Sequence, residues 1–168
     1  MRTSQQGNYY DLHYQSVHYK GSLGLFTSFY HQQLERRRKS KSHYPKVLEI
    51  GAGTGEHLQF VKHTFDEYIL SDITLHPTSL SNLNLDPRKD KLHFLMADAT
   101  NLPIEDDKFD RVLCTCVLHH ISDLELALNE IRRVSANNAV IDLYVPCVPG
   151  LIYRWLRHFT SHYKQKKL

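Results

Sequence analysis

The sequence predicts an α/β fold, a doubly wound and mainly parallel Rossmann-like sheet of about five strands with helices on both faces. Three observations predict it. Short apolar runs alternate with helix-like segments, a glycine-rich turn follows the first run, and an acidic residue ends each of the next two. Strands that are joined through helices require right-handed crossovers, and therefore a parallel sheet that is covered on both sides.

The composition is that of one ordinary globular domain. The chain has 168 residues, of which 41% are hydrophobic and 23% are charged. No apolar run reaches the roughly 18 residues of a membrane-spanning helix, and the first residues lack the apolar middle of a secretory signal. Three cysteines without a Cys-x-x-Cys pair indicate neither a disulfide framework nor a zinc site. We therefore expect a cytoplasmic protein that holds no metal.

The net charge of +3 conceals an acidic centre between two basic ends. Residues 49–149 contain sixteen acidic and eight basic side chains, whereas residues 150–168 contain five basic and no acidic ones. This distribution differs from a basic face that follows nucleic acid, so we expect no nucleic-acid partner. It favours a central domain that accommodates a cation and ends that contact anions.

Residues 1–44 form a predicted N-terminal helical or lid segment. Ser22 can cap a helix whose apolar positions recur at spacings of three and four. These positions are Leu23, Phe26, Tyr30 and Leu34. The many Tyr and His side chains of the segment fit a lid over a substrate and plain packing on the sheet equally well. A basic hinge over residues 36–41 and then Pro45 separate the segment from the core.

Residues 45–150 form the predicted core. The first strand covers residues 46–50, and apolar residues on one face predict a helix over residues 57–65. Further strands are expected at residues 67–73, 91–98, 109–118 and 139–145.

A second core helix is expected between the last two strands. Ser122 and Glu125 match a capping box that opens it, and the pair Asn137–Asn138 can end it in the left-handed conformation. Its inward side chains are expected to be Leu124, Leu128 and Ile131.

The sharpest motif is the run Gly51-Ala-Gly-Thr-Gly-Glu56, which follows the first strand. Open α/β sheets bind ligands at such a turn, and glycines let a ligand approach the backbone closely. The dinucleotide fingerprint has a glycine where Glu56 stands, and a carboxylate there would repel a pyrophosphate. The loop therefore predicts a ligand without phosphate, and a plain glycine turn is the alternative.

Two acidic residues, Asp72 and Asp98, end the second and third predicted strands at the same edge of the sheet. Asp72 follows the glycine loop at about the distance expected of a ribose-binding acid. Each residue alone fits a turn or a helix cap. Their common position beside the glycine loop favours a ligand site.

These motifs together resemble one family. The run VLEIGAGTGEH, then Asp72, then MADATNLPIEDDKFDRVLCTCVLHHISDLELALNEIRRV resembles class I S-adenosylmethionine-dependent methyltransferases of the small-molecule and lipid type. The resemblance implies S-adenosylmethionine as cofactor. Its methionine part would lie among Glu49, Gly51, Ala52, Gly53 and Gly55, its ribose at Asp72 and its adenine at Asp98 and Ala99, with Cys116 to His120 lining the methyl-transfer pocket.

The cofactor is a sulfonium cation without phosphate, which agrees with a glycine loop flanked by acids. Two features depart from the family. The segment Ser135-Ala-Asn-Asn138 replaces the usual Lys-Pro-Gly-Gly turn, and only five of the family's seven strands can be placed. The C-terminal hairpin of the family is therefore expected to be missing, either because the chain is a fragment or because another segment covers the edge beside the fifth strand.

His119 and His120 are the candidate catalytic residues, because a base is needed where the methyl acceptor must lose a proton. The alternative is that one of them packs and the other lies beside the cofactor without titrating. Cys114 and Cys116 alternate along the fourth strand, so both are expected on one buried face.

The predicted function is methyl transfer to a small or amphiphilic acceptor. A non-catalytic cofactor-binding subunit and a truncated enzyme are the alternatives, and a nucleotide-dependent oxidoreductase is disfavoured by Glu56. Residues 151–168 predict a basic amphipathic helix with Trp155 on its apolar side. Such a helix either covers the fifth strand or makes peripheral contact with an anionic membrane.

Overall fold

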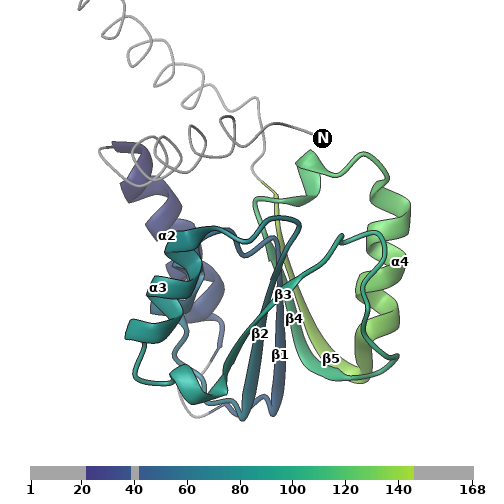
Figure 1. Ribbon diagram of the computed structural model, residues 1–168, viewed down its shortest axis with the longest axis horizontal. Helices are drawn as coiled ribbons and strands as arrows, with labels where there is room; N and C mark the ends of the chain where they lie inside the picture. The colour runs from purple at the N-terminus through teal and green to yellow at the C-terminus, as the bar shows by residue number, and fades with distance from the viewer. Residues whose placement is uncertain (1–21, 39–41, 146–168) are drawn as a thin grey trace, which may run out of the picture.

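The computed structural model describes residues 22–38 and 42–145. Five parallel strands form one sheet in the order β3-β2-β1-β4-β5, which confirms the predicted fold class (Figure 1). The predictions made for residues 1–21 and for the C-terminal helix lie outside the described residues. The strands are β1 (Lys46–Ile50), β2 (Glu67–Asp72), β3 (Leu92–Met96), β4 (Phe109–Thr115) and β5 (Ser135–Tyr144).

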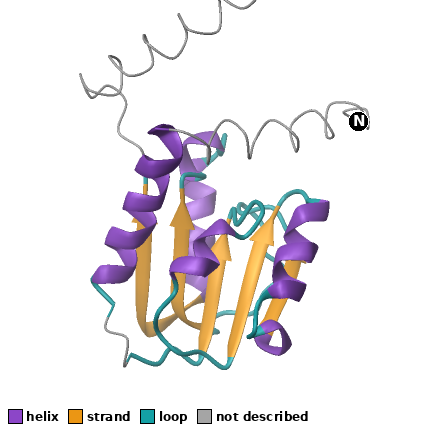
Figure 2. Ribbon diagram, turned by 90° about the vertical axis from the view of Figure 1, so that its left-hand side faces the viewer, coloured by secondary structure: helices purple, strands orange, loops and turns teal. Residues whose placement is uncertain are grey.

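Helices cover both faces of this sheet. Figures 1 and 2 show α2 and α3 on one side and α4 on the other. The α-helices are α2 (Ser22–Arg36), α3 (Pro77–Leu85) and α4 (Leu124–Val134), and the short 3-10 helices are η1 (Glu56–Phe60), η2 (Lys89–Lys91) and η3 (Leu118–His120). Helix α3, which begins at Pro77, was not predicted from the sequence.

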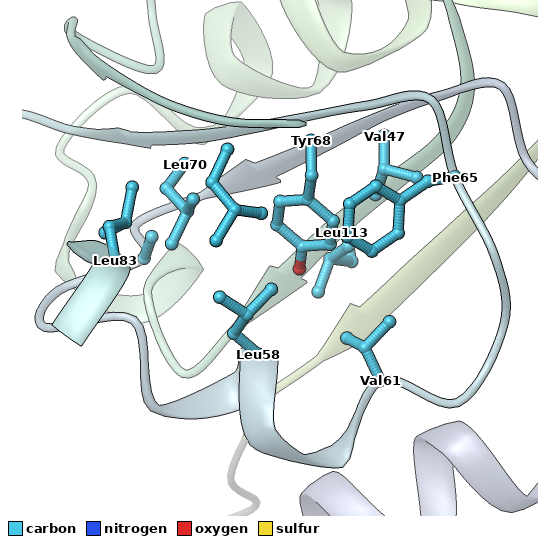
Figure 3. Packing of buried hydrophobic residues seen from close by; sticks show 10 residues of the cluster. Val47, Leu58, Val61, Phe65, Tyr68, Leu70, Leu83 and Leu113 are labelled. Atoms are coloured by element: carbon cyan, nitrogen blue, oxygen red, sulfur yellow. The ribbon is translucent and has the colours of Figure 1, made fainter. Parts of the chain in front are cut away.

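One hydrophobic cluster fills the space between the sheet and the α3 side. Strands β1, β2 and β4 contribute Val47, Tyr68 and Leu113, which are all fully buried. In Figure 3, Leu58 and Val61 point toward these sheet residues. Burying each large apolar side chain is worth about 1.5–3 kcal/mol, so this cluster fixes the segment that follows the glycine loop.

A second cluster lies beneath α4. Successive side chains of a strand point to opposite faces, so Leu48 and Ile50 face away from the first cluster. They pack with Cys114 of β4 and with Ile131 and Val134 of α4. The sheet is therefore buried on both sides, as a parallel sheet requires.

The helix predicted over residues 57–65 is wrong in extent. Only η1 forms, and Val61 already has an extended conformation. The backbone of Thr64 pairs instead with the segment before β1, donating to Ser42 O and accepting from the Tyr44 N–H, both at 3.0 Å. His43 and Thr64 thus form an isolated parallel β-bridge. The apolar side chains of this segment, Leu58, Val61 and Phe65, are nevertheless buried.

Helix α4 also begins and ends elsewhere than predicted. Asp123, rather than Ser122, caps it by accepting the Leu126 N–H at 3.0 Å. The helix ends at Val134, and the pair Asn137–Asn138 lies within β5, where a register shift accommodates it. Its buried side chains are Ala127, Ile131 and Val134, whereas Leu124 and Leu128 are exposed.

Candidate functional site at the glycine loop

The glycine loop follows β1, the strand from which the chain adds β2 and β3 on one side of the sheet and β4 and β5 on the other. Strand β1 pairs with β2 on one side and with β4 on the other, so Ile50 lies between Ser71 and Cys114. The N–H groups of Gly51 and Ala52 both donate to Ser71 O, at 2.8 and 3.0 Å. Open α/β sheets bind ligands at such a switch point, beyond the carboxyl ends of the strands.

The three loop glycines all have positive φ, but they serve different purposes. A Cβ on Gly51 would lie 2.5 Å from the Val117 side chain, so this glycine permits close packing against the segment after β4. Among the residues that the structure describes, a Cβ on Gly53 would meet no atom within 4 Å, at a φ of +55°. Open space beside a left-handed backbone is what a ligand that approaches the loop requires.

Asp72 holds the loop and remains available to a ligand. Its Oδ2 accepts the Gly53 N–H at 2.9 Å, and its Oδ1 accepts the Thr74 N–H at 3.1 Å. The side chain is half-buried, and a carboxylate has about four lone-pair sites. The described residues use two of these sites, which leaves two that can accept hydroxyl groups of a ligand. The sequence predicted that Asp72 lies beside the glycine loop, and the structure shows that it also accepts the Gly53 N–H.

Helix α3 fixes the loop from the other side, which sequence reasoning missed. The Ser79 hydroxyl donates to Gly53 O at 2.7 Å, and the Asn82 amide donates to Thr54 O at 2.9 Å. Ser79 is fully buried. Only Pro77 at the start of α3 signals this helix in the sequence. The loop carbonyls thus have rigid donors before any ligand binds.

Glu49 lies beneath the loop, in the core. Its side chain is 1% exposed, and its Oε2 accepts the Tyr68 hydroxyl at 2.8 Å. Burial raises the pKa of Glu49, while His57 and the Tyr68 hydrogen bond act in the opposite direction. The structure therefore places Glu49 below the surface of the loop rather than at its open side.

Glu56 is the second acid of this region. Burial raises its pKa to about 7, and the charge of Glu49 acts in the same direction. The Thr54 hydroxyl donates a hydrogen bond to its Oε1. The loop is therefore flanked by carboxyl groups whose negative charge attracts a cation. A bound cation would in turn favour the ionised form of these groups.

Asp98 and Ala99 follow β3 near this edge. Ala97 donates its N–H to Asp72 O at 2.9 Å, which joins the end of β3 to Asp72. Asp98 is exposed, and its Oδ1 accepts both the N–H and the hydroxyl of Thr100 at 2.8 Å. These hydrogen bonds lower its pKa. In this structure Asp98 forms a turn.

Cys116 follows β4 in a left-handed conformation, with a φ of +58°. Its N–H donates to Tyr144 O at 3.0 Å, and burial raises its pKa to about 11, so the thiol stays protonated near neutral pH. Cys114 lies within β4 and packs under α4. The prediction that both cysteines share one strand face is therefore wrong, because the strand ends at Thr115.

His119 and His120 lie in η3, on the segment that continues from Val117. Both side chains are exposed, and their ring centroids are 3.9 Å apart. Burial and then His120 lower the pKa of His119. The structure therefore places the pair after β4, at the same edge of the sheet as the glycine loop.

In residues 22–38 and 42–145, no three His, Cys, Asp or Glu side chains are grouped to hold a metal ion. Nor does this part of the chain contain a helix long and apolar enough to cross a membrane.

Comparison with known proteins identifies the family. The sequence profile described as "Methyltransferase domain" matches residues 48–141. Over 110 residues the chain is 31% identical to the uncharacterized methyltransferase YcgJ of Bacillus subtilis, covering 63% of this chain and 44% of that protein. Over 118 residues it is 29% identical to the demethylmenaquinone methyltransferase of Corynebacterium urealyticum, covering 68% and 49%.

The fold agrees with these sequence matches. The crystal structure of YcgJ superposes with a TM-score of 0.60 at 25% identity, covering 79% of this chain and 58% of that one. The chain spans less than half the length of the two curated relatives. The family profile nevertheless extends from the first strand of the sheet into the fifth. The chain therefore belongs to the class I methyltransferases, whose cofactor is S-adenosylmethionine.

Proposed function

We propose that this protein transfers a methyl group from S-adenosylmethionine to a small or amphiphilic acceptor. The observation that carries the proposal is the open side of Gly53, directly beside the Asp72 carboxylate. Backbone that is free of side-chain atoms and a carboxylate with spare lone pairs suit an adenosine ligand without phosphate.

The residues of the loop have separate roles in this proposal. Asp72 accepts the ribose hydroxyls, while Gly51, Ala52, Gly53 and Gly55 leave room for the methionine part. S-adenosylmethionine supplies an electrophilic methyl group on a positively charged sulfur. Glu49 and Glu56 contribute negative charge near that cation, which is most effective where water is partly excluded. Positioning of the acceptor then supplies most of the acceleration.

The segments after β3 and β4 complete the proposed site. Asp98 accepts the adenine amino group, and the Ala99 N–H faces the ring. Cys116 to His120 line the acceptor side, because this segment begins beside the glycine loop, where Val117 meets Gly51. His120, with His119 as its neighbour, takes a proton from acceptors that must lose one.

An amphiphilic acceptor is favoured by one of the relatives, which is named a demethylmenaquinone methyltransferase. The basic residues of the C-terminal segment, which the described part of the chain does not include, fit the same idea. Each suitably placed cation contributes about 1 kcal/mol at an anionic membrane surface. Sedimentation of the protein with vesicles that contain anionic lipid tests this idea. Binding that weakens at high salt, and that weakens when Lys164, Lys166 and Lys167 are replaced by Gln, would support a lipid-like acceptor. Absence of sedimentation at low salt would favour a soluble metabolite.

Calorimetric titration of the full chain tests the cofactor. We expect binding of S-adenosylmethionine and of its demethylated product, and no binding of NAD. Binding of NAD alone would overturn the proposal in favour of an oxidoreductase. Transfer of labelled methyl groups to extracted metabolites and lipids then tests catalysis. Cofactor binding without any transfer would favour a non-catalytic subunit, an alternative that follows from the short span relative to the curated relatives.

A further inference from the structure

A network of buried charges joins α2 to the sheet. Arg111 of β4 is fully buried, and its Nη2 lies 2.7 Å from Glu35 Oε1 and 2.9 Å from Asp142 Oδ2. Arg38, just beyond α2, also pairs with Asp142. Two cations thus face two carboxylates, and both Glu35 and Arg111 are almost completely removed from water.

Two histidines extend this network toward the glycine loop. His57 Nε2 lies 3.0 Å from Glu35 Oε1, and His57 Nδ1 lies 2.7 Å from His31 Nδ1. Glu35 is ionised near neutral pH: burial opposes its charge, but His57 and Arg111 lower its pKa to about 2. An ionised carboxylate only accepts hydrogen bonds. His57 must therefore carry its hydrogen on Nε2 and donate it to Glu35.

The remaining contacts of the network have fixed directions too. The Arg111 guanidinium has no acceptor, so it donates from Nη1 to His63 Nε2 at 2.6 Å. His63 then carries its hydrogen on Nδ1 and donates to Thr64 O at 3.2 Å. Burial and then His57 lower the pKa of His31 to about 3, so His31 is neutral. The partners around His57 are therefore defined in both position and hydrogen-bond direction.

His57 connects this network to the cofactor loop. It is the second residue of η1, which begins immediately after Gly55. The next residue, Leu58, donates its N–H to Gly55 O at 3.2 Å. Helix α3 anchors the loop carbonyls of Gly53 and Thr54, whereas α2 reaches the far end of the loop through His57. The loop is therefore held between two helices, by part-buried hydrogen bonds from α3 and by the buried His57–Glu35 contact to α2.

We propose that His57, held by Glu35, is a positioning residue for the cofactor loop, so that α2 is part of the cofactor-binding unit. The inference rests on the proposed function, because it assigns the loop to cofactor binding. Buried ion pairs give little stability relative to apolar residues of the same volume. Placement of the loop is therefore a better account of this network than stability alone.

Substitutions of His57 separate its two contacts. In His57→Gln the amide nitrogen takes the place of Nε2 and keeps the donor to Glu35, whereas in His57→Asn it takes the place of Nδ1. His57→Leu loses both contacts and leaves Glu35 paired with Arg111. The control is Arg38→Gln, which weakens the attachment of α2 to β5 while Asp142 keeps Arg111. Calorimetry with S-adenosylmethionine gives the dissociation constant of each full-length variant.

We expect His57→Leu and His57→Asn to weaken cofactor binding at least tenfold, and His57→Gln and Arg38→Gln to stay within threefold. Hydrogen exchange of the amides of residues 51–55, measured without cofactor, should accelerate in His57→Leu and not in Arg38→Gln. Folded His57→Leu with unchanged binding and unchanged exchange would overturn the proposal. If the wild type binds no cofactor, the proposed function fails, while hydrogen exchange still reports whether His57 holds the loop.

One measurement needs no variant. Nitrogen NMR of the wild-type imidazoles should show that His57 carries a hydrogen on Nε2 at neutral pH. A His57 with a bare Nε2 cannot donate to Glu35, and this result would overturn the proposal even if every His57 variant failed to fold.

Discussion

The Tyr68 hydroxyl donates a 2.8 Å hydrogen bond to the buried carboxylate of Glu49. Both side chains are at most 1% exposed, and both project from the sheet beneath the glycine loop. A carboxyl group at this depth needs a donor, because an unpaired buried polar group is costly. The Tyr68 hydroxyl therefore favours the ionised form of Glu49, while its ring packs in the hydrophobic core.

Replacement of Tyr68 by Phe should destabilise the fold by about 1–3 kcal/mol, since Glu49 loses its buried donor. The pKa of Glu49 should rise further, because this hydrogen bond lowers it. Urea unfolding measures the first effect. Tyr44→Phe is the matched control, since the Tyr44 ring packs against the same cluster, and an equal loss in both variants would contradict the role of the hydroxyl.

Gly53→Ala should reduce cofactor affinity at least tenfold while the core stays intact. Its new Cβ would enter open space and meet the ligand, and a left-handed alanine costs about 1–2 kcal/mol of stability. Gly51→Ala should destabilise the fold more, because its Cβ overlaps Val117. Titration and thermal unfolding of both variants check this contrast. Unchanged affinity in Gly53→Ala would place the cofactor elsewhere.

Asp72→Ala should weaken cofactor binding by about 1.5–3 kcal/mol, the usual contribution of a hydrogen bond to a charged group. It also removes the acceptor of the Gly53 N–H, so hydrogen exchange at Gly53 should accelerate even without cofactor. The exposed Asp90→Ala is the control. A folded Asp72→Ala that binds with the wild-type dissociation constant would refute the ribose role.

Affinity for S-adenosylmethionine should increase about tenfold between pH 6 and pH 8. The pKa of Glu56 is raised to about 7, so this carboxyl is largely protonated at pH 6. A cation favours its ionised form, and binding therefore releases a proton. Calorimetry at the two pH values measures the change. Glu56→Gln should remove most of it, and a variant with the full pH dependence would assign the effect to another group.

The contribution of His31 to the free energy of unfolding should fall as the pH falls below about 6.5, whereas Glu56, whose pKa is raised to about 7, contributes in the opposite direction. His31 has a pKa of about 3 in the folded protein and 6.5 as its ordinary value, so only the unfolded chain takes up its proton in this window. This contribution of His31 is complete above pH 6.5 and is lost progressively toward pH 3. Urea titrations at several pH values measure the slope. His31→Phe should lack this loss, so its slope should differ from that of the wild type, and an identical slope in both proteins would contradict this source.

Local signals predicted the central part of the fold well. The apolar run of β1 is bounded by glycines, and its predicted limits agree with the structure. The position of Asp72 beside the glycine loop follows from strand direction alone, because parallel strands end at one edge. The predicted limits of the longer strands and of the helices agree less well with the structure. Asn137–Asn138 is a reasonable stop signal, but pairing with β4 extends β5 back to Ser135.

Other features had no local signal. The spacing of Leu58, Val61 and Phe65 fits a helix, yet a 3-10 turn followed by an extended segment buries the same three side chains. The buried network depends on residues that are far apart in the sequence, such as Glu35 and Arg111. An arginine inside an apolar strand is unusual, and this is the only hint of the network that the sequence contains.

The buried pairing of Glu35 with Arg111 also constrains the order in which the protein can fold during synthesis. Glu35 leaves the ribosome long before Arg111, and β1 must wait for β4 as its second neighbour. Until then, docking α2 would bury a carboxylate without its cation, which is costly. Helix α2 should therefore attach late, after the centre of the sheet has closed. Such long-range closure is slow, so the nascent chain carries an undocked α2 at least until Arg111 has been synthesised.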